Sequence, residues 1–176
     1  MILREPIQLR RRRQVHDLGE LMSIYECNYI RLRQLIPDLA AIAEAGAVSL
    51  ASGALDLHLC VSERNRYTTT LTLTYLFEDE HGQFPAPDIQ LRIYHDARLA
   101  EVISCGRRRG LRSAAAYDSW RREYNLDDKW FINRFLQKWL GYCLRQGHRF
   151  RSADLNSLTP AGSWDEVINA FQTADD

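Results

Sequence analysis

Residues 55–77 contain two runs in which apolar and polar side chains alternate. In the first run, aliphatic side chains occupy positions 55, 57, 59 and 61. In the second run, Leu71, Leu73, Tyr75 and Phe77 alternate chiefly with threonine. A period of two is typical of a strand that buries one face and leaves the other polar. The chain therefore has to build an antiparallel sheet whose dry face needs a covering layer.

The connection between these two runs decides which residues pair. A loop of residues 63–65 sets Leu57 opposite Leu71 and keeps the apolar side chains on one face. A loop one residue longer would set leucines opposite threonines. Asn65 also tolerates the left-handed backbone that the last position of a three-residue loop requires. We therefore predict a hairpin with the shorter loop.

A second hairpin is predicted farther along the chain. Residues 89–93 alternate apolar and polar side chains, and residues 99–105 form the returning strand. A turn over residues 95–98 brings the apolar positions of the two strands together and places Arg92 directly opposite Glu101. An opposite-charge pair across two strands contributes roughly 0.2–1 kcal/mol, which supports this register.

Two longer segments carry the periodicity of helices. The first begins near Asp17, which can cap it, and Pro37 stops it. The second begins at Asp127 or Asp128, and Gly147 ends it. Its apolar stripe, which we expect to pack on the dry face of the sheet, consists of Ile132, Phe135, Leu136, Trp139, Leu140 and Cys143.

The remaining segments are less regular. Residues 38–45 are predicted to form a helical turn, residues 81–87 a loop, and residues 106–126 irregular structure. A final helix is predicted after Ser163, with an apolar stripe of Trp164, Val167, Ile168 and Phe171. Helix, meander and helix in one chain predict an α+β fold. We expect an antiparallel β-meander of about four to five strands, with N-terminal and C-terminal helices packed on one face.

The composition fits one globular domain. The chain has 176 residues, of which 45% are apolar and 26% are charged, close to the averages for such domains. Because Arg10 to Arg13 repel one another, we expect residues 1–16 to form a basic arm and residues 17–176 a single domain. No apolar run approaches the roughly 18 residues of a membrane helix, and the arginine-rich start is not a secretory signal.

Charge and cysteine content narrow the classes of function. Lys and Arg number 23, and so do Asp and Glu, which argues against a general nucleic-acid binder. The 4 cysteines form no C-x-x-C pair, so the common zinc and redox motifs are missing from the sequence. We expect reduced thiols, a cytoplasmic location, and neither a metal nor a cofactor.

The sequence assigns candidate binding residues but no catalytic residue. It lacks the phosphate-loop, dinucleotide, zinc-protease and nucleophile-elbow motifs. Arg66, at the tip of the first hairpin, can hold an anion. The tip and strands of the second hairpin concentrate ionisable side chains, although Asp96 is expected to bond its own turn. The candidates are Arg66, Arg92, Tyr94, His95, Asp96 and Glu101.

Several stretches also recur in one order that is typical of a known family. They are Glu26-Cys27-Asn28-Tyr29, Arg66-Tyr67-Thr68-Thr69, Tyr94-His95-Asp96-Ala97, Ala100-Glu101-Val102, and Lys129 with Ile132-Asn133 onward to Gly147. In these stretches the chain resembles the YqiB-like family of uncharacterised proteobacterial proteins. The resemblance covers about residues 20–147 and leaves residues 148–176 as a C-terminal extension. It implies a small bacterial cytoplasmic protein and transfers no catalytic residue.

These observations favour a non-enzymatic binding or regulatory module. Two alternatives stay open: a structural subunit of an assembly, including a homo-oligomer, and an enzyme of unfamiliar type that uses the Tyr94-His95-Asp96 hairpin. A pocket converging on His95 and Glu101 would favour the enzyme, and a large exposed apolar patch would favour the subunit. The expected partner is an unknown protein or small molecule, and neither a membrane nor a nucleic acid is expected.

Overall fold

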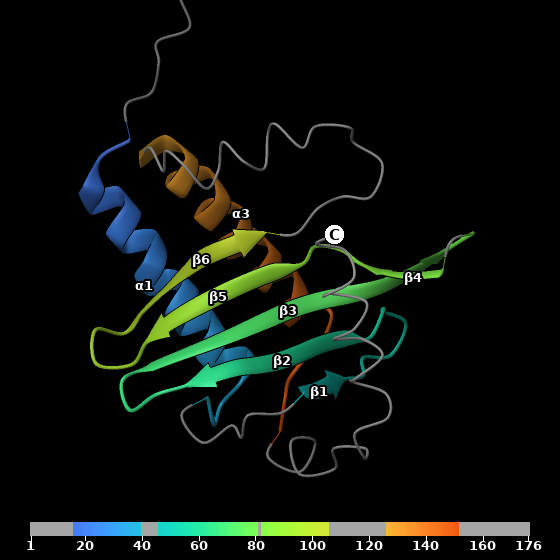
Figure 1. The fold of residues 1–176 in the computed structure, drawn as a ribbon. Coiled ribbons are helices and arrows are strands. Elements are labelled where there is room, and N and C mark those ends of the chain that lie inside the picture. The colour runs from blue at the N-terminus through green and yellow to red at the C-terminus, as the bar shows by residue number, and fades with distance from the viewer. Residues whose placement is uncertain (1–15, 40–45, 81, 106–125, 152–176) are drawn as a thin grey trace, which may run out of the picture.

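The computed structural model places two helices on one side of a single sheet (Figure 1). It describes residues 16–39, 46–80, 82–105 and 126–151. Within them the elements are, in chain order, α1 (Leu18–Leu35), β1 (Gly46–Ser49), β2 (Leu57–Arg64), β3 (Thr68–Asp79), β4 (Gly82–Pro85), β5 (Ile89–Tyr94), β6 (Leu99–Cys105) and α3 (Leu126–Arg145).

Three expectations fall outside the described residues. They concern the basic arm before His16, the irregular stretch over residues 106–125 and the helix after Ser163. The helical turn expected after Pro37 is described only as far as residue 39. His16, the last residue of the expected arm, is buried, and its ring stacks on Trp130 with 3.8 Å between the ring centroids.

Helix α1 begins and ends where the sequence indicates. The Asp17 carboxylate accepts a hydrogen bond from the Glu20 backbone N at 2.7 Å, which satisfies one free N–H group of the first turn. The Glu20 carboxylate faces the His16 ring, 3.3 Å away, and so does not complete a capping box. At the other end the helix stops at Leu35, shortly before Pro37 removes a backbone donor.

The strands form one antiparallel sheet in the order β1-β2-β3-β5-β6, and β4 pairs with the end of β3. The long strand β3 lies at the centre of the sheet (Figure 1). The predicted α+β fold is confirmed, with two strands that the sequence pattern did not reveal. Strand β1 is very short, and β4 contains glycine and proline, which strands tolerate at their edges and ends. The loop predicted over residues 81–87 is therefore partly a strand.

The β2–β3 hairpin keeps the predicted faces but not the predicted pairing. Leu57 pairs with Tyr75 rather than with Leu71, so the predicted register is wrong. The loop has three residues, as predicted, but it consists of residues 65–67. A bulge after Val61 carries β2 past the end of its alternating run, and hydrophobic alternation does not reveal a bulge in advance.

The β5–β6 hairpin matches its prediction. Ile93 pairs with Ala100, and Arg92 pairs with Glu101. The turn consists of residues 95–98, as the alternation required. Both strands keep their aliphatic side chains on the buried face, which leaves Arg92 and Glu101 on the opposite one.

Helix α3 ends in a glycine turn that satisfies its last carbonyl groups. Gly147 has a positive φ of 89°, a conformation that favours glycine. The Gly147 backbone N donates to the Leu144 carbonyl oxygen and the His148 backbone N to that of Cys143, each at 3.1 Å. This pair of bonds is a Schellman motif, and it confirms Gly147 as the end of the helix.

The core lies between the two helices and the dry face of the sheet. The Trp139 ring meets the Tyr75 ring edge-on at 5.8 Å, and the Tyr75 hydroxyl lies 3.3 Å from Cys143 Sγ. The sequence predicts that Phe135 belongs to the buried stripe. This prediction is wrong, because Phe135 is 44% exposed. Helix α3 packs against α1 through the side that carries Gln137, which turns Phe135 outward. The buried members of the α3 stripe are Leu136, Trp139, Leu140 and Cys143.

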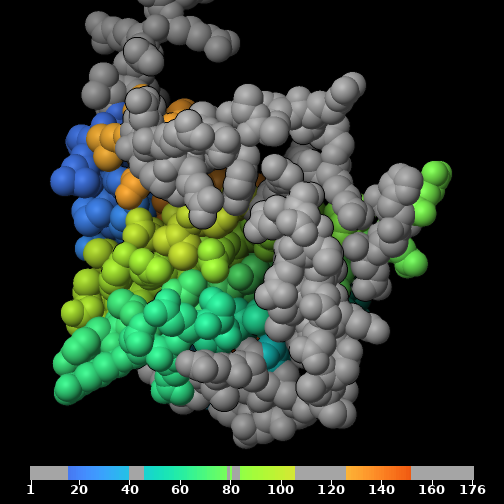
Figure 2. Space-filling view, viewed as in Figure 1, coloured from blue at the N-terminus to red at the C-terminus, as the bar shows by residue number. Residues whose placement is uncertain are grey.

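The other face of the sheet forms much of the surface in Figure 2, where β2, β3, β5 and β6 appear in green to yellow-green. The alternation predicts a polar face here. Thr72 and Arg92 are partly exposed, but Thr70 and Thr74 are buried. The alternation therefore predicted the direction of these side chains but not how far each is exposed.

Candidate functional site

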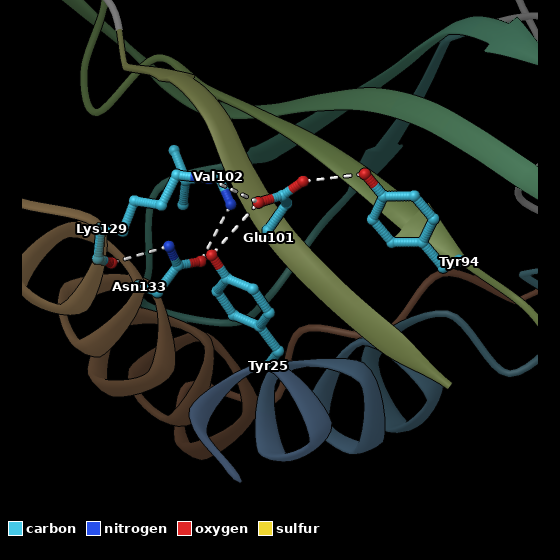
Figure 3. Close-up of polar contacts among 6 residues, drawn as sticks. All are labelled: Tyr25, Tyr94, Glu101, Val102, Lys129 and Asn133. Carbon is cyan, nitrogen blue, oxygen red and sulfur yellow. Dashed lines mark hydrogen bonds and ion pairs between the residues drawn. The ribbon is translucent and has the colours of Figure 1, made fainter. Parts of the chain in front are cut away.

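Glu101 is the centre of a polar cluster at the edge of the sheet (Figure 3). Its two carboxylate oxygens accept hydrogen bonds from the Tyr25 hydroxyl at 3.2 Å and the Tyr94 hydroxyl at 2.8 Å. Lys129 Nζ lies 3.8 Å from the oxygen that Tyr25 contacts. Side chains from α1, β5 and α3 thus meet at one carboxylate on β6. We call Tyr25, Tyr94, Glu101 and Lys129 the Glu101 cluster.

Asn133 joins this cluster to the backbone of β6. Its Oδ1 accepts a hydrogen bond from the Val102 backbone N at 2.9 Å, and its Nδ2 donates to the Lys129 carbonyl oxygen at 2.8 Å. Asn28 of α1 donates from Nδ2 to the Asn133 carbonyl oxygen at 3.2 Å. Because β6 is the last strand of the sheet among the described residues, its outward N–H groups have no described neighbouring strand to bond. Asn133 therefore satisfies a buried donor and ties α3 to the sheet.

The surroundings of the Glu101 cluster keep both phenols protonated. Burial, the charge of Glu101 and the hydrogen bond to it raise the pKa of Tyr25 far above its ordinary value. Burial and Glu101 also raise the pKa of Tyr94, and the neighbouring Arg92 acts in the opposite direction. Both hydroxyl groups are therefore hydrogen-bond donors at neutral pH, and Lys129 balances the carboxylate charge. Such a bonded carboxylate is suited to linking elements together.

Arg92 lies opposite Glu101 in the register but does not form the expected ion pair with it. The Glu101 carboxylate turns instead toward Tyr25, Tyr94 and Lys129. No ion pair joins Arg92 to Glu101 in the part of the chain that the structure describes. The physical reason is position. Because β6 is the last strand of the described sheet, Tyr25 of α1 and Lys129 of α3 reach one carboxylate oxygen from the helices, and Tyr94 of the neighbouring strand bonds the other.

His95 lies apart from the Glu101 cluster, where the tips of the β2–β3 and β5–β6 hairpins meet. Its Nε2 is 2.8 Å from Thr69 Oγ1, and its backbone N donates to the Tyr67 carbonyl oxygen at 2.8 Å. Burial and the positive charges of Arg33 and Arg64 lower the pKa of His95. The imidazole is therefore held neutral near neutral pH and links β3 to the turn after β5.

The remaining candidates also lie at the hairpin tips. Asp96 Oδ1 accepts a hydrogen bond from the Ala97 backbone N at 2.8 Å, in keeping with the local turn bond expected of it. The Arg66 guanidinium lies over the Tyr67 ring, 5.0 Å from its centroid. The structure thus groups Tyr94 with Glu101 and places His95, Asp96 and Arg66 elsewhere. Within the described residues, no contact joins His95 to Glu101.

The thiols and potential metal ligands are dispersed. In the described ranges, no group of three or more His, Cys, Asp or Glu side chains is placed to hold a metal ion. The cysteines at positions 27, 60, 105 and 143 form no disulfide with one another. Burial raises the pKa of Cys143 to about 11, which leaves this thiol protonated and poorly nucleophilic at neutral pH.

The outer surface of α3 carries a feature that the sequence interpretation missed. Phe131 is 59% exposed, and Phe135 and Tyr142 are each 44% exposed. These aromatic residues and Lys138 recur at steps of four, three and four, which puts them on one helix face. We call Phe131, Arg134, Phe135, Lys138 and Tyr142 the α3 outer face. The spacing is visible in the sequence, but the sequence analysis assigns Phe135 to the buried stripe and assigns no role to Phe131 or Tyr142.

A comparison with known families decides the relationship of this chain. Residues 31–149 match the model of a family described as "Protein of unknown function (DUF1249)". The chain belongs to this family. The DUF1249 region contains the α3 outer face and most of the Glu101 cluster, and it ends before the last part of the chain.

Curated relatives support the same assignment. The "Uncharacterized protein YqiB" of Escherichia coli K12 is 34% identical over 137 residues, which cover 77% of this chain and 94% of the relative. The proteins of the same name in E. coli O6:H1 and O157:H7 match to the same extent. The resemblance to a YqiB-like family of unknown function is therefore confirmed. No solved structure matches the chain.

A hydropathy search of the helices gives one further finding. Within the described residues, neither α1 nor α3 combines the length and the hydrophobicity that a membrane-spanning helix requires.

Proposed function

We propose that this DUF1249 protein is a non-enzymatic binding module whose α3 outer face binds an acidic, partly apolar segment of a partner protein. The observation that carries the proposal is the exposure of Phe131, Phe135 and Tyr142 on one face of a helix. Complete burial of a phenylalanine side chain contributes about 1.5–3 kcal/mol, so these rings provide a driving force for association. Aromatic side chains are also enriched among the residues that dominate binding energies.

The charge of this face indicates the chemistry of the partner. Arg134 and Lys138 lie among the aromatic residues, and α3 contains no Asp or Glu from Lys129 to Arg145. The whole chain has a formal net charge of +0, so this is a local excess of positive charge. A partner that carries carboxylates around an apolar stripe complements such a surface.

The dimensions of the face favour a short segment over a large subunit surface. The aromatic residues form one stripe interleaved with cations, whereas permanent subunit interfaces are broad and more uniformly apolar. The balanced charge of the chain argues against a general nucleic-acid binder. In this proposal the Glu101 cluster and Asn133 act as positioning groups, since they hold α3 in one orientation on the sheet. We also propose a cytoplasmic location, which four cysteines without a disulfide among them support.

The test uses the full chain and a defined probe. The probe is a fluorescein-labelled peptide of glutamate with leucine and tryptophan at every third or fourth position, and binding is followed by fluorescence anisotropy. Phe135→Ala and Lys138→Glu should each weaken binding at least about tenfold, as expected for central residues of an interface. A peptide with lysine in place of glutamate should bind far more weakly, because its charges have the wrong sign.

The hairpin tip offers a matched control. Arg66 and Tyr67 are another exposed pair of a cation and an aromatic residue. Arg66→Glu and Tyr67→Ala should leave peptide binding unchanged. Equal losses at the tip and at α3 would contradict the proposal, because they would indicate non-specific attraction. Binding of a single-stranded oligonucleotide that Lys138→Glu abolishes, with no peptide binding, would replace the protein partner by a nucleic acid.

A further inference from the structure

The chain itself contains a segment with the chemistry that the α3 outer face requires. The residues after Arg151 include five carboxylate side chains and no lysine or arginine. Trp164, Val167, Ile168 and Phe171 recur there at steps of three and four, which is the spacing of one helix face. The end of the chain thus combines an apolar stripe with negative charge.

We propose that residues 163–176 bind the α3 outer face of the same molecule and compete there with the external partner. This inference rests on the proposed function and adds to it the identity of one occupant. The segment complements both the aromatic rings and the positive charges of the α3 outer face. The ring of Phe135 matches an aromatic and aliphatic stripe, and the charge of Lys138 matches the carboxylates around that stripe.

The connection between the two parts is long enough for this contact. Helix α3, from Leu126 to Arg145, is about 30 Å long at 1.5 Å per residue. Residues 152–162 can span up to about 35 Å when extended. A segment attached through such a linker has an effective concentration of about millimolar, so even weak intrinsic binding leads to substantial occupancy.

The family match includes the α3 outer face but not the segment proposed to bind it. The DUF1249 match ends at residue 149, so it includes α3 and excludes the acidic segment. The family region therefore presents the binding face, and this chain adds a segment that can cover it. The expected consequence is an intramolecular competitor that raises the concentration of external partner needed for binding.

The experiment compares two full-length proteins with the acidic probe peptide described above. In the release variant, Trp164→Ala and Phe171→Ala remove the two largest side chains of the stripe. We expect the release variant to bind the probe at least about tenfold more tightly than the wild-type chain, because an effective concentration of about millimolar no longer competes. A labelled peptide of residues 160–176 should bind the release variant in the same way, and Lys138→Glu in that variant should abolish both interactions.

The controls make each failure distinguishable. Asn169→Ala lies on the opposite side of the predicted helix and should leave probe binding at the wild-type level. Equal binding by the wild type and the release variant would overturn this inference and leave the proposed function intact. Tighter binding that Lys138→Glu does not affect would also overturn it, because the segment would then cover another surface. No probe binding by either protein would overturn both proposals.

Discussion

Helix α3 carries aromatic side chains on two faces that differ in their surroundings. On the inner face, Trp139 is 8% exposed and packs edge-on against Tyr75. On the outer face, Phe135 is 44% exposed. The two residues lie four positions apart, at the adjoining edges of the two faces, so neither helix propensity nor spacing distinguishes them. What packs against each residue makes the inner ring part of the core and leaves the outer ring exposed to solvent.

Polar contacts decide which face of α3 is the inner one. Asn133 accepts a hydrogen bond from the backbone of Val102, and Lys129 pairs with Glu101. Both contacts fix the rotation of the helix about its axis, because each requires one side of α3 to face β6. The comparison teaches that polar contacts at the sheet edge and the burial of the apolar stripe favour the same rotation of the helix, in which Trp139 is buried and Phe135 is exposed.

The largest expected effect is the loss of the inner aromatic residue. Trp139→Ala should lower the free energy of unfolding by about 3–5 kcal/mol, because it removes a large side chain from a packed core. Urea denaturation measures this value, and Lys138→Ala, on the exposed side of the same turn, is the control. A variant as stable as the wild type would show that the inner face is not part of the core.

A smaller loss of stability is expected when the hydrogen bond between α3 and the edge strand β6 is removed. Asn133→Ala should cost about 1–3 kcal/mol, because the buried Val102 N–H group loses its acceptor. Lys129→Ala removes the partly exposed ion pair to Glu101, so it should be the less destabilising of the two. Thermal unfolding of both variants checks the order, and the reverse order would argue against the bond to Val102.

The pH dependence of stability tests the buried side of the molecule at His148, which directly follows the glycine turn at the end of α3. His148 is buried, its Nδ1 lies 3.3 Å from Ser49 Oγ, and burial lowers its pKa below the ordinary 6.5. Below that value the unfolded chain takes up a proton that the folded chain refuses, so stability falls as the pH drops from neutral. His148→Gln should therefore lose less stability than the wild type between pH 7 and about pH 5.5, which urea titrations at both pH values can measure. A pH-induced loss of equal size in both proteins would exclude this contribution.

The smallest effect on stability is expected on the outer face. Phe135→Ala should lower the free energy of unfolding by no more than about 1 kcal/mol, because nearly half of the residue is already exposed in the folded protein. The same variant should lose binding of the acidic peptide, so the two readouts separate binding from folding. A loss of stability close to that of Trp139→Ala would remove the distinction between the two faces.

The exposure of Phe135 also marks a limit of what the hydrophobic pattern predicts. The sequence assigns six apolar residues of α3 to one buried stripe. Only four of them are buried in the core, namely Leu136, Trp139, Leu140 and Cys143. A helix has room for two apolar stripes, and periodicity alone does not tell which of them faces a neighbour.

Local chemistry determined a large part of this protein. Alternation of side chains fixed the faces of β2, β3, β5 and β6, since a strand has a period of two. Asp17 and Gly147 marked the helix ends, because their preferences concern the backbone beside them. The pairing of Arg92 with Glu101 followed from the need to keep both apolar faces together.

Only the tertiary structure decided the contacts that depend on distant parts of the chain. The bulge after Val61 shifted the β2–β3 pairing without changing any face, so the hydrophobic pattern could not reveal it. Glu101 bonds Tyr25 and Lys129, which lie far from it in sequence and approach it only once both helices pack beside β6. The α3 outer face depends on the tertiary structure in the same way. The packing of α1, α3 and the sheet determines which side of α3 is buried, and the other side is left exposed.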